Sequence, residues 1–133
     1  MNLPLDIQAY NDKQSAEERN ICETLSQTIN IFPGWTEAKL WHGHPVWFIE
    51  GNPIVGYDKL KSCVRLLFRS GQSFDEDILT AEGSFQAADI RYTQSDHIDI
   101  KSLARLLQKA TLIQRDYKNI VKRKGKLEKL TNF

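Results

Sequence analysis

The chain has 133 residues, of which 41% are hydrophobic and 26% are charged. This composition is ordinary for a soluble globular domain, and the length allows one core without disulfides or a metal. No stretch approaches the ~20 consecutive apolar residues of a transmembrane helix. The first residues lack the basic and apolar regions of a secretory signal. We therefore expect one cytoplasmic domain over residues 1–133, without membrane contact.

The formal net charge of +1 hides an uneven distribution along the chain. Residues 1–99 carry 8 basic and 15 acidic side chains, whereas residues 100–133 carry 10 basic and 2 acidic ones. The sequence therefore predicts a mildly acidic body and a basic C-terminal end. Cys22 and Cys63 lie in no metal-ligand spacing, so we interpret both as buried, reduced thiols, with a disulfide or a reactive thiol as the alternative.

The first predicted element is preceded by residues 1–14, which are polar and aperiodic and are interpreted as an N-terminal arm. Ser15 and Glu18 have the spacing of a capping box, in which the serine hydroxyl accepts from a free amide of the first turn. Apolar residues then recur at helical spacing until Pro33-Gly34, which predicts a helix over residues 15–32.

The following segments alternate polar and apolar residues, as strands with one covered and one wet face do. We predict five antiparallel strands, over residues 36–42, 45–50, 53–60, 63–69 and about 87–93. Gly43 breaks the chain between the first two strands, and Gly51-Asn52 forms a tight turn between the second and the third. The connection from the fourth to the fifth strand contains a predicted helical turn over residues 76–79.

Asp99 is a good N-cap for a long C-terminal helix, which an apolar stripe predicts over residues 100–123. Its last turns are expected to overhang the sheet, and residues 124–133 form a basic tail. The predicted fold class is α+β, a five-stranded antiparallel sheet with the 15–32 and 100–123 helices packed on one face. The predicted core consists of Ile21, Leu25, Ile29, Leu40, Trp47, Val64, Leu66, Phe68, Ile90, Leu103, Leu106, Leu107 and Ala110.

A family resemblance begins with the run Trp41-His42-Gly43-His44-Pro45-Val46-Trp47 and continues through Val55-Gly56-Tyr57, Val64-Arg65-Leu66-Leu67-Phe68, Gly71, Ile90-Arg91-Tyr92 and Asp99. Over about residues 15–112 this pattern resembles the YdhG-like family, domain of unknown function 1801. The resemblance implies an antiparallel sheet backed by terminal helices. Because some family members are described as frataxin-like iron chaperones, it also implies iron carriage as one function, without a ligand set for particular residues.

Two candidate sites lie near the first strand break. Residues i and i+2 of a strand share a face, so His42 and His44 could contact one metal ion. The alternative is that the histidines pack beside Trp41 and Trp47 or form hydrogen bonds at the strand break. Trp41, His44, Phe48 and Tyr57 are predicted to line a small-ligand pocket on the wet face at this break.

Asp75, Glu76 and Asp77 form an acidic group after the fourth strand. Exposed carboxylates of this kind would suit the weak iron binding that the family resemblance implies. The alternative is that they only favour the start of a helical turn, where the helix dipole attracts negative charge. A second possible metal group, Asp96-His97 with Asp99, is better explained by turn and cap residues.

The basic residues at the C-terminal end of the chain have two interpretations. Its lysines and arginines could contact phosphates, or they could simply suit a solvated helix C-terminus. No nucleic-acid motif accompanies them. The sequence also contains no nucleophile elbow, phosphate-binding loop, dinucleotide fingerprint or zinc-protease motif.

We therefore expect a non-catalytic binding protein that requires no cofactor, and in one version a frataxin-like carrier of weakly bound iron. The first alternative is a small-ligand-binding domain or an enzyme with its pocket at the strand break. The second is a protein- or nucleic-acid-interaction module that uses the basic C-terminal end, of which nucleic acid is the less expected partner. The sequence is compatible with a monomer or a homodimer.

Overall fold

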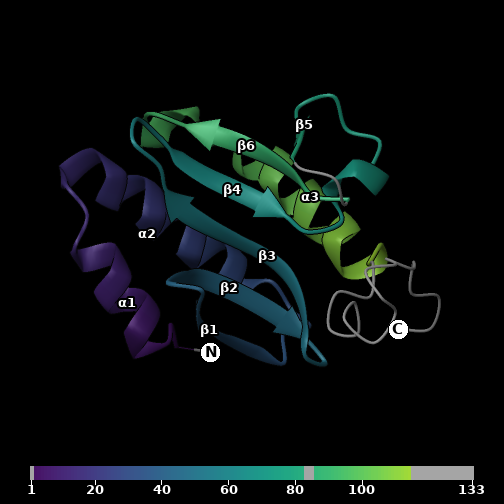
Figure 1. Ribbon diagram of the computed structural model, residues 1–133, viewed down its shortest axis with the longest axis horizontal. Coiled ribbons are helices and arrows are strands. Elements are labelled where there is room, and N and C mark those ends of the chain that lie inside the picture. The colour runs from purple at the N-terminus through teal and green to yellow at the C-terminus, as the bar shows by residue number, and fades with distance from the viewer. Residues whose placement is uncertain (1, 83–85, 115–133) are drawn as a thin grey trace.

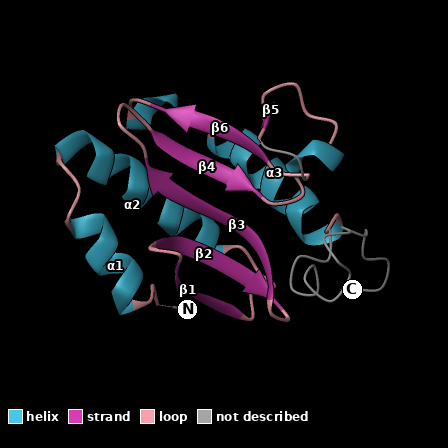
Figure 2. Ribbon diagram, viewed as in Figure 1, coloured by secondary structure: helices cyan, strands magenta, loops and turns pink. Residues whose placement is uncertain are grey.

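The computed structural model describes residues 2–82 and 86–114. They form an α+β fold in which an open antiparallel sheet is backed by helices on one face (Figures 1 and 2). The helices are α1 (Leu5–Asp12), α2 (Ala16–Ile31) and α3 (Ile100–Leu112), with short 3-10 turns η1 (Gly71–Ser73) and η2 (Ser95–His97). The strands are β1 (Glu37–Trp41), β2 (His44–Ile49), β3 (Asn52–Lys59), β4 (Val64–Phe68), β5 (Thr80–Ala81) and β6 (Ala88–Tyr92), in the order β1-β2-β3-β4-β6-β5.

The predicted fold class is confirmed, but the described residues contain six strands and not five. The five predicted strands correspond to β1–β4 and β6. The missed strand, β5, has two exposed residues, which pair with Asp89 and Ala88 at the sheet edge. The helical turn predicted over residues 76–79 is also wrong, because the helical turn is η1 and residues 76–79 form a tight turn closed from the Leu79 amide to the Glu76 carbonyl (3.3 Å).

The predicted N-terminal arm is wrong, because residues 5–12 form α1. Ile7 on this helix is fully buried in the core. The Asp6 carboxylate accepts a hydrogen bond from the amide of Leu40 (2.8 Å). Leu40 lies in β1, an outer strand of the sheet, so α1 satisfies a backbone donor that would otherwise be exposed at a sheet edge.

The hydrophobic core lies between the sheet and the helices. Every predicted core residue belongs to it, although Leu40 and Ile90 are only partly buried. Trp47 is fully buried and its indole N–H donates to the Asn30 side chain (3.1 Å). The core also contains Ile7, Ile54, Val55, Tyr57, Phe74, Tyr92 and Ile98, which were not predicted. Cys22 is buried as predicted, whereas Cys63 is only partly buried.

Two tight turns shape the β1-β2-β3 meander. Trp41 pairs with His44, so residues 42–43 are a two-residue hairpin turn, and both have positive φ (53° and 85°). Ile49 pairs with Asn52, so Glu50-Gly51 forms the second such turn, with φ of 51° and 80°. Positive φ at both central residues is typical of a type I′ turn, whose twist matches that of paired strands. The break predicted at Gly43 is therefore a hairpin, and the second turn lies one residue before the predicted Gly51-Asn52.

The helix termini differ in part from the predictions. The Asp99 carboxylate caps α3 as expected, accepting from the Lys101 amide (3.1 Å) and the Ser102 hydroxyl (2.9 Å). In the predicted capping box, however, the Ser15 hydroxyl donates to the Glu18 carboxylate and caps no amide. The helix predicted over 100–123 ends at Leu112, and its last residues, like the basic tail 124–133, lie outside the described residues. None of the described helices has the length and apolar character needed to cross a membrane.

Candidate functional site

The face of the sheet opposite α2 and α3 is turned toward the viewer in Figure 1, and we call it the open face. Paired residues of antiparallel strands share a face. The register therefore places Lys39, Val46, Gly56, Leu67 and Asp89 in one row across the open face. Trp41 and His44 form the neighbouring pair at the β1-β2 turn.

An aromatic–cationic group occupies the β1-β2 side of the open face and consists of Lys39, Trp41, Phe48 and Arg69. The Trp41 and Phe48 rings meet edge to face, with centroids 5.7 Å apart. The Arg69 guanidinium lies 5.2 Å from the centre of the Trp41 ring, and the Lys39 ammonium lies 5.2 Å from that of Phe48. Each cation is attracted by the negative face of its ring, by about 0.5–1 kcal/mol at exposed sites. Phe48 is buried beneath these neighbours, whereas Trp41 is partly exposed.

His44 begins β2 beside this group. Its Nδ1 atom is buried and has no hydrogen-bond partner, and no other buried side-chain nitrogen or oxygen of the described residues is in this state. Burial lowers the pKa of His44 below its usual value, against the opposing effect of the negative charge on Asp58. The imidazole is therefore neutral at pH 7.

A chain of ion pairs fills the β3-β4-β6 side of the open face. Arg65 binds the Asp58 carboxylate through two hydrogen bonds (3.0 and 2.9 Å) and lies 3.7 Å from Glu82. Arg91 lies 3.5 Å from Glu82 and 3.4 Å from Asp89. Asp89 is 2% exposed, and burial raises its pKa while Arg91 opposes that shift. Because opposite charges are paired along this chain, this side of the face offers a ligand little uncompensated charge.

The structure brings together three of the four residues predicted to line a pocket at the strand break. Trp41, His44 and Phe48 lie on the open face, but Tyr57 lies on the opposite face, in the core and 1% exposed. Its hydroxyl donates to Asn11 on α1 (2.5 Å), and burial raises its pKa strongly. The predicted grouping is therefore wrong for Tyr57.

The geometric argument for a metal ion between the two histidines also fails. His42 lies in the hairpin turn, so the two side chains are not at i and i+2 of one strand. The His42 ring instead packs 4.2 Å from that of Trp41. For His42 this matches the alternative interpretation, in which the ring packs beside a tryptophan.

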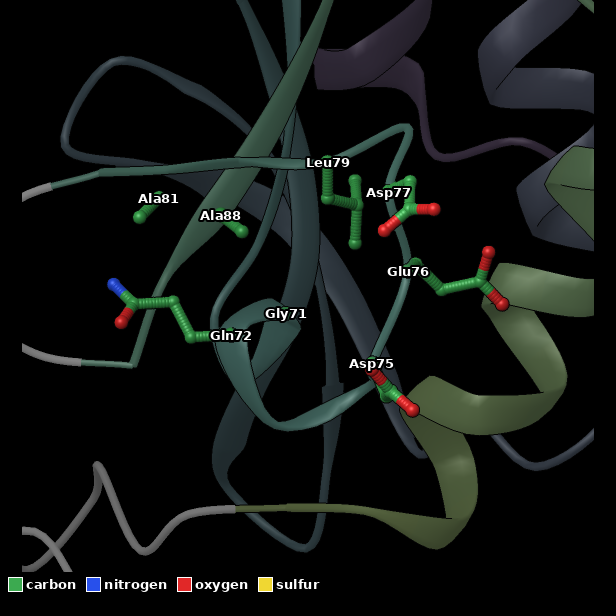
Figure 3. Close-up of a pocket in the computed structure, with 8 residues that line it drawn as sticks. All are labelled: Gly71, Gln72, Asp75, Glu76, Asp77, Leu79, Ala81 and Ala88. Atoms are coloured by element: carbon green, nitrogen blue, oxygen red, sulfur yellow. The ribbon is translucent and has the colours of Figure 1, made fainter.

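The acidic residues predicted as metal ligands lie on the loop between η1 and β5, at a hollow of about 310 Å³ (Figure 3). The Glu76 side chain extends toward α3, where Arg105 binds it through two hydrogen bonds (3.0 and 2.9 Å) and Lys109 lies 2.6 Å away. These hydrogen bonds, first that of Arg105, lower the pKa of Glu76 to about 2. The negative charge of Glu76 is thus already balanced by two cations, while Asp75 and Asp77 are exposed at the hollow.

Metal ligation has little geometric support elsewhere. The described residues contain no group of three or more His, Cys, Asp or Glu side chains that could hold a metal ion. Asp99 is taken up by its capping role, as the turn-and-cap interpretation of Asp96-His97 and Asp99 required. Cys22 is fully buried, and burial raises the pKa of its thiol to about 12, so it is no nucleophile at neutral pH.

Two further hollows lie away from the aromatic–cationic group. One of about 320 Å³ is lined by residues 30–35, after the end of α2. The other, of about 400 Å³, is lined by Glu17 and residues 93–96 near η2. The aromatic–cationic group is therefore a surface rather than part of any of these three hollows.

Lys39 and Arg69 were missed as site residues. The alternation of residues 36–42 could have found Lys39, because it lies two positions before Trp41 and so on the same face. Arg69 could be placed only with the pairing of β3 and β4, which brings it across the sheet to Trp41. The chain matches no protein-family model, and neither a curated protein nor a solved structure is significantly similar to it.

Proposed function

We propose that this protein is a non-catalytic binding protein that holds its ligand on the aromatic–cationic group of the open face. The observation that carries the proposal is the convergence of two aromatic rings and two cations from β1, β2 and the end of β4 on a face that none of the described helices covers. The run that carries the resemblance to the YdhG-like family forms the β1-β2 hairpin of this surface. That position supports a role for the hairpin beyond packing.

The chemistry of the group suits a small molecule with a flat apolar part and a negative charge. A flat ring can stack on the partly exposed Trp41, as aromatic groups do at an offset or edge to face. A carboxylate or phosphate can pair with the Lys39 ammonium, which also pairs with Glu37 (3.1 Å), or with the Arg69 guanidinium. His44 is neutral at pH 7, so it would add a hydrogen bond rather than a charge.

Indole-3-acetate is a suitable probe of this class, with uncharged indole-3-acetamide as its analogue. In ¹⁵N-labelled protein, we expect indole-3-acetate to shift the Trp41 indole signal saturably with a Kd of about 1 mM or below, and the amide to bind about tenfold more weakly. With the backbone amide signals of β1 and β2 as the readout, Trp41→Ala should abolish saturation and Arg69→Gln should weaken it about tenfold, since each removes one half of the recognition. The buried Trp47 signal serves as the internal control.

Trp35→Ala is the matched variant, because Trp35 is also partly exposed but lines the hollow after α2. Binding should survive in this variant. A shift that stays linear to about 10 mM would end the proposal for this ligand class. A saturable shift confined to the Trp35 signal would move the binding site to the other hollow.

Iron carriage is a second candidate, favoured by the two exposed carboxylates of Asp75 and Asp77 at one hollow. It also follows from the resemblance to a family with members described as iron chaperones. Carboxylate oxygens suit weakly held, exchangeable cations.

The iron version predicts saturable binding when the purified protein is titrated anaerobically with ferrous iron. The dissociation constant should lie below about 1 mM and rise at least tenfold in the double variant Asp75→Asn with Asp77→Asn, because both carboxylates are removed. Asp96→Asn is the matched control, an exposed aspartate on the separate turn η2. Unsaturable binding, or an equal loss in the control, would rule out this site.

A further inference from the structure

An apolar surface lies at the end of the molecule where both long helices stop. The Glu17 carboxylate on the first turn of α2 accepts from the Ser95 amide (2.6 Å), just before the start of α3, so the two helices begin at the same end. Their other ends both meet the β2-β3 hairpin. Asn30 accepts from Trp47 on the α2 side, and Gln114 accepts from Asn52 on the α3 side (3.3 Å).

Large apolar side chains are exposed at this end of the molecule. The Ile31 side chain at the end of α2 is 80% exposed, and Leu112 at the end of α3 is 62% exposed. Beside Ile31, the rings of Phe32 and Trp35 lie 6.5 Å apart and line the hollow of about 320 Å³. Exposed apolar side chains gathered around a hollow are typical of a surface that another segment covers. We call Ile31, Phe32, Trp35 and Leu112 the end surface.

The chain itself is directed to this end where the described residues stop. Ile113 leaves the helical conformation (φ −118°, ψ 103°) and packs against the core. Gln114 is 2% exposed and hydrogen-bonded to Asn52. The described part of the chain therefore stops beside the β2-β3 turn, at the same end of the molecule as the end surface. The nineteen residues that follow can span up to about 60 Å when extended, so reach does not limit them.

The composition of residues 115–133 complements this end. The segment contains 7 basic and 2 acidic residues. Its apolar residues are Tyr117, Ile120, Val121, Leu127, Leu130 and Phe133. The end surface lies at two helix C-termini, which attract positive charge; α3 has Lys109 in its last turn, but α2 has no basic residue there.

We propose that residues 115–133 of this chain dock on the end surface of the same molecule, with apolar side chains over the hollow beside Ile31 and basic side chains near the helix C-termini. The inference is independent of the ligand proposed for the open face, because it involves none of the residues of the aromatic–cationic group. It assigns the basic end of the chain an intramolecular partner in place of nucleic acid.

Limited trypsin digestion of the intact chain tests the proposal, because trypsin cuts after lysine and arginine. Cleavage within residues 115–133 should be at least about ten times slower in the folded protein than in a free peptide of that sequence, since the docked segment must first detach from the end surface. Ile31→Asp and Leu112→Asp should each bring the rate close to that of the peptide. Both side chains are mostly exposed, so neither variant should unfold the domain, and a circular dichroism spectrum checks this.

Ile100→Asp is the matched control, because Ile100 is 49% exposed on α3 but lies at its opposite end. Its cleavage rate should equal that of the unmodified protein. Peptide-like cleavage of the unmodified protein, or slow cleavage unchanged by Ile31→Asp and Leu112→Asp, would overturn the proposal. Protection that rises with protein concentration together with a doubled mass in light scattering would identify a second copy as the occupant and overturn docking within one molecule.

Discussion

Replacing Ile7 by alanine is expected to lower the free energy of unfolding by about 2–5 kcal/mol, as much as Leu66→Ala in β4. Both side chains are fully buried in the same core, although Ile7 lies in the segment whose sequence indicates an arm. The loss of stability combines the transfer free energy of the removed side-chain atoms with the cost of the cavity that they leave. Urea unfolding followed by circular dichroism measures both variants.

Leu5→Ala controls for any general effect of changing α1, because Leu5 lies on the same helix but is 88% exposed. Its effect should stay within about 0.5 kcal/mol. A loss below about 1 kcal/mol for Ile7→Ala, beside a full loss for Leu66→Ala, would mean that α1 contributes little to the core.

The sequence did not predict α1 because the buried face of this helix is not apolar. Of its eight residues only Ile7 and Asn11 are buried. Because Asn11 is polar, no apolar residues recur at helical spacing in this segment. An isolated helix of this length is marginal in water, so tertiary contacts must stabilise it. The Asp6 contact with β1 and the Asn11 contact with Tyr57 come from residues far along the chain, which no local pattern predicts.

The sheet and the start of α3 were predictable because alternation and capping are local signals. The missed strand β5 has two residues, both exposed, and depends on pairing with β6 alone. The end of α3 was not predictable either, because the apolar stripe continues past Leu112 in the sequence. In the structure Ile113 leaves the helical conformation, and the Gln114 side chain accepts from Asn52.

Of the four residues predicted to line the pocket only Tyr57 is misplaced, and a single bulge explains that error, whereas Lys39 and Arg69 were not predicted. If β2 and β3 paired without interruption from the Ile49–Asn52 pair, His44 would face Tyr57. The observed register shifts between Trp47 and Phe48, so that Phe48 pairs with Pro53 and Trp47 with Val55, which leaves Ile54 as an extra residue. A shift of one residue moves a strand's side chains to the other face. Tyr57 therefore enters the core.

Replacing Asn11 by alanine is expected to destabilise the protein by about 1–3 kcal/mol, because its side chain joins two buried polar groups. Its carbonyl oxygen accepts from the Tyr57 hydroxyl (2.5 Å), and its amide donates to the Ser26 hydroxyl (3.0 Å). Asn11, Ser26 and Tyr57 are each at most 1% exposed, so water cannot replace the lost partner.

Combining Asn11→Ala with Tyr57→Phe should cost less than the sum of the single changes, by about 0.5 kcal/mol or more, because the second change removes a group that the first left unpaired. Urea unfolding of the four proteins of this cycle gives the coupling, and Gln8→Ala, which removes part-exposed hydrogen bonds of the same helix, should cost about 0.5 kcal/mol or less. Additive effects of Asn11 and Tyr57 would show that the hydrogen bond between them does not hold α1 against the sheet.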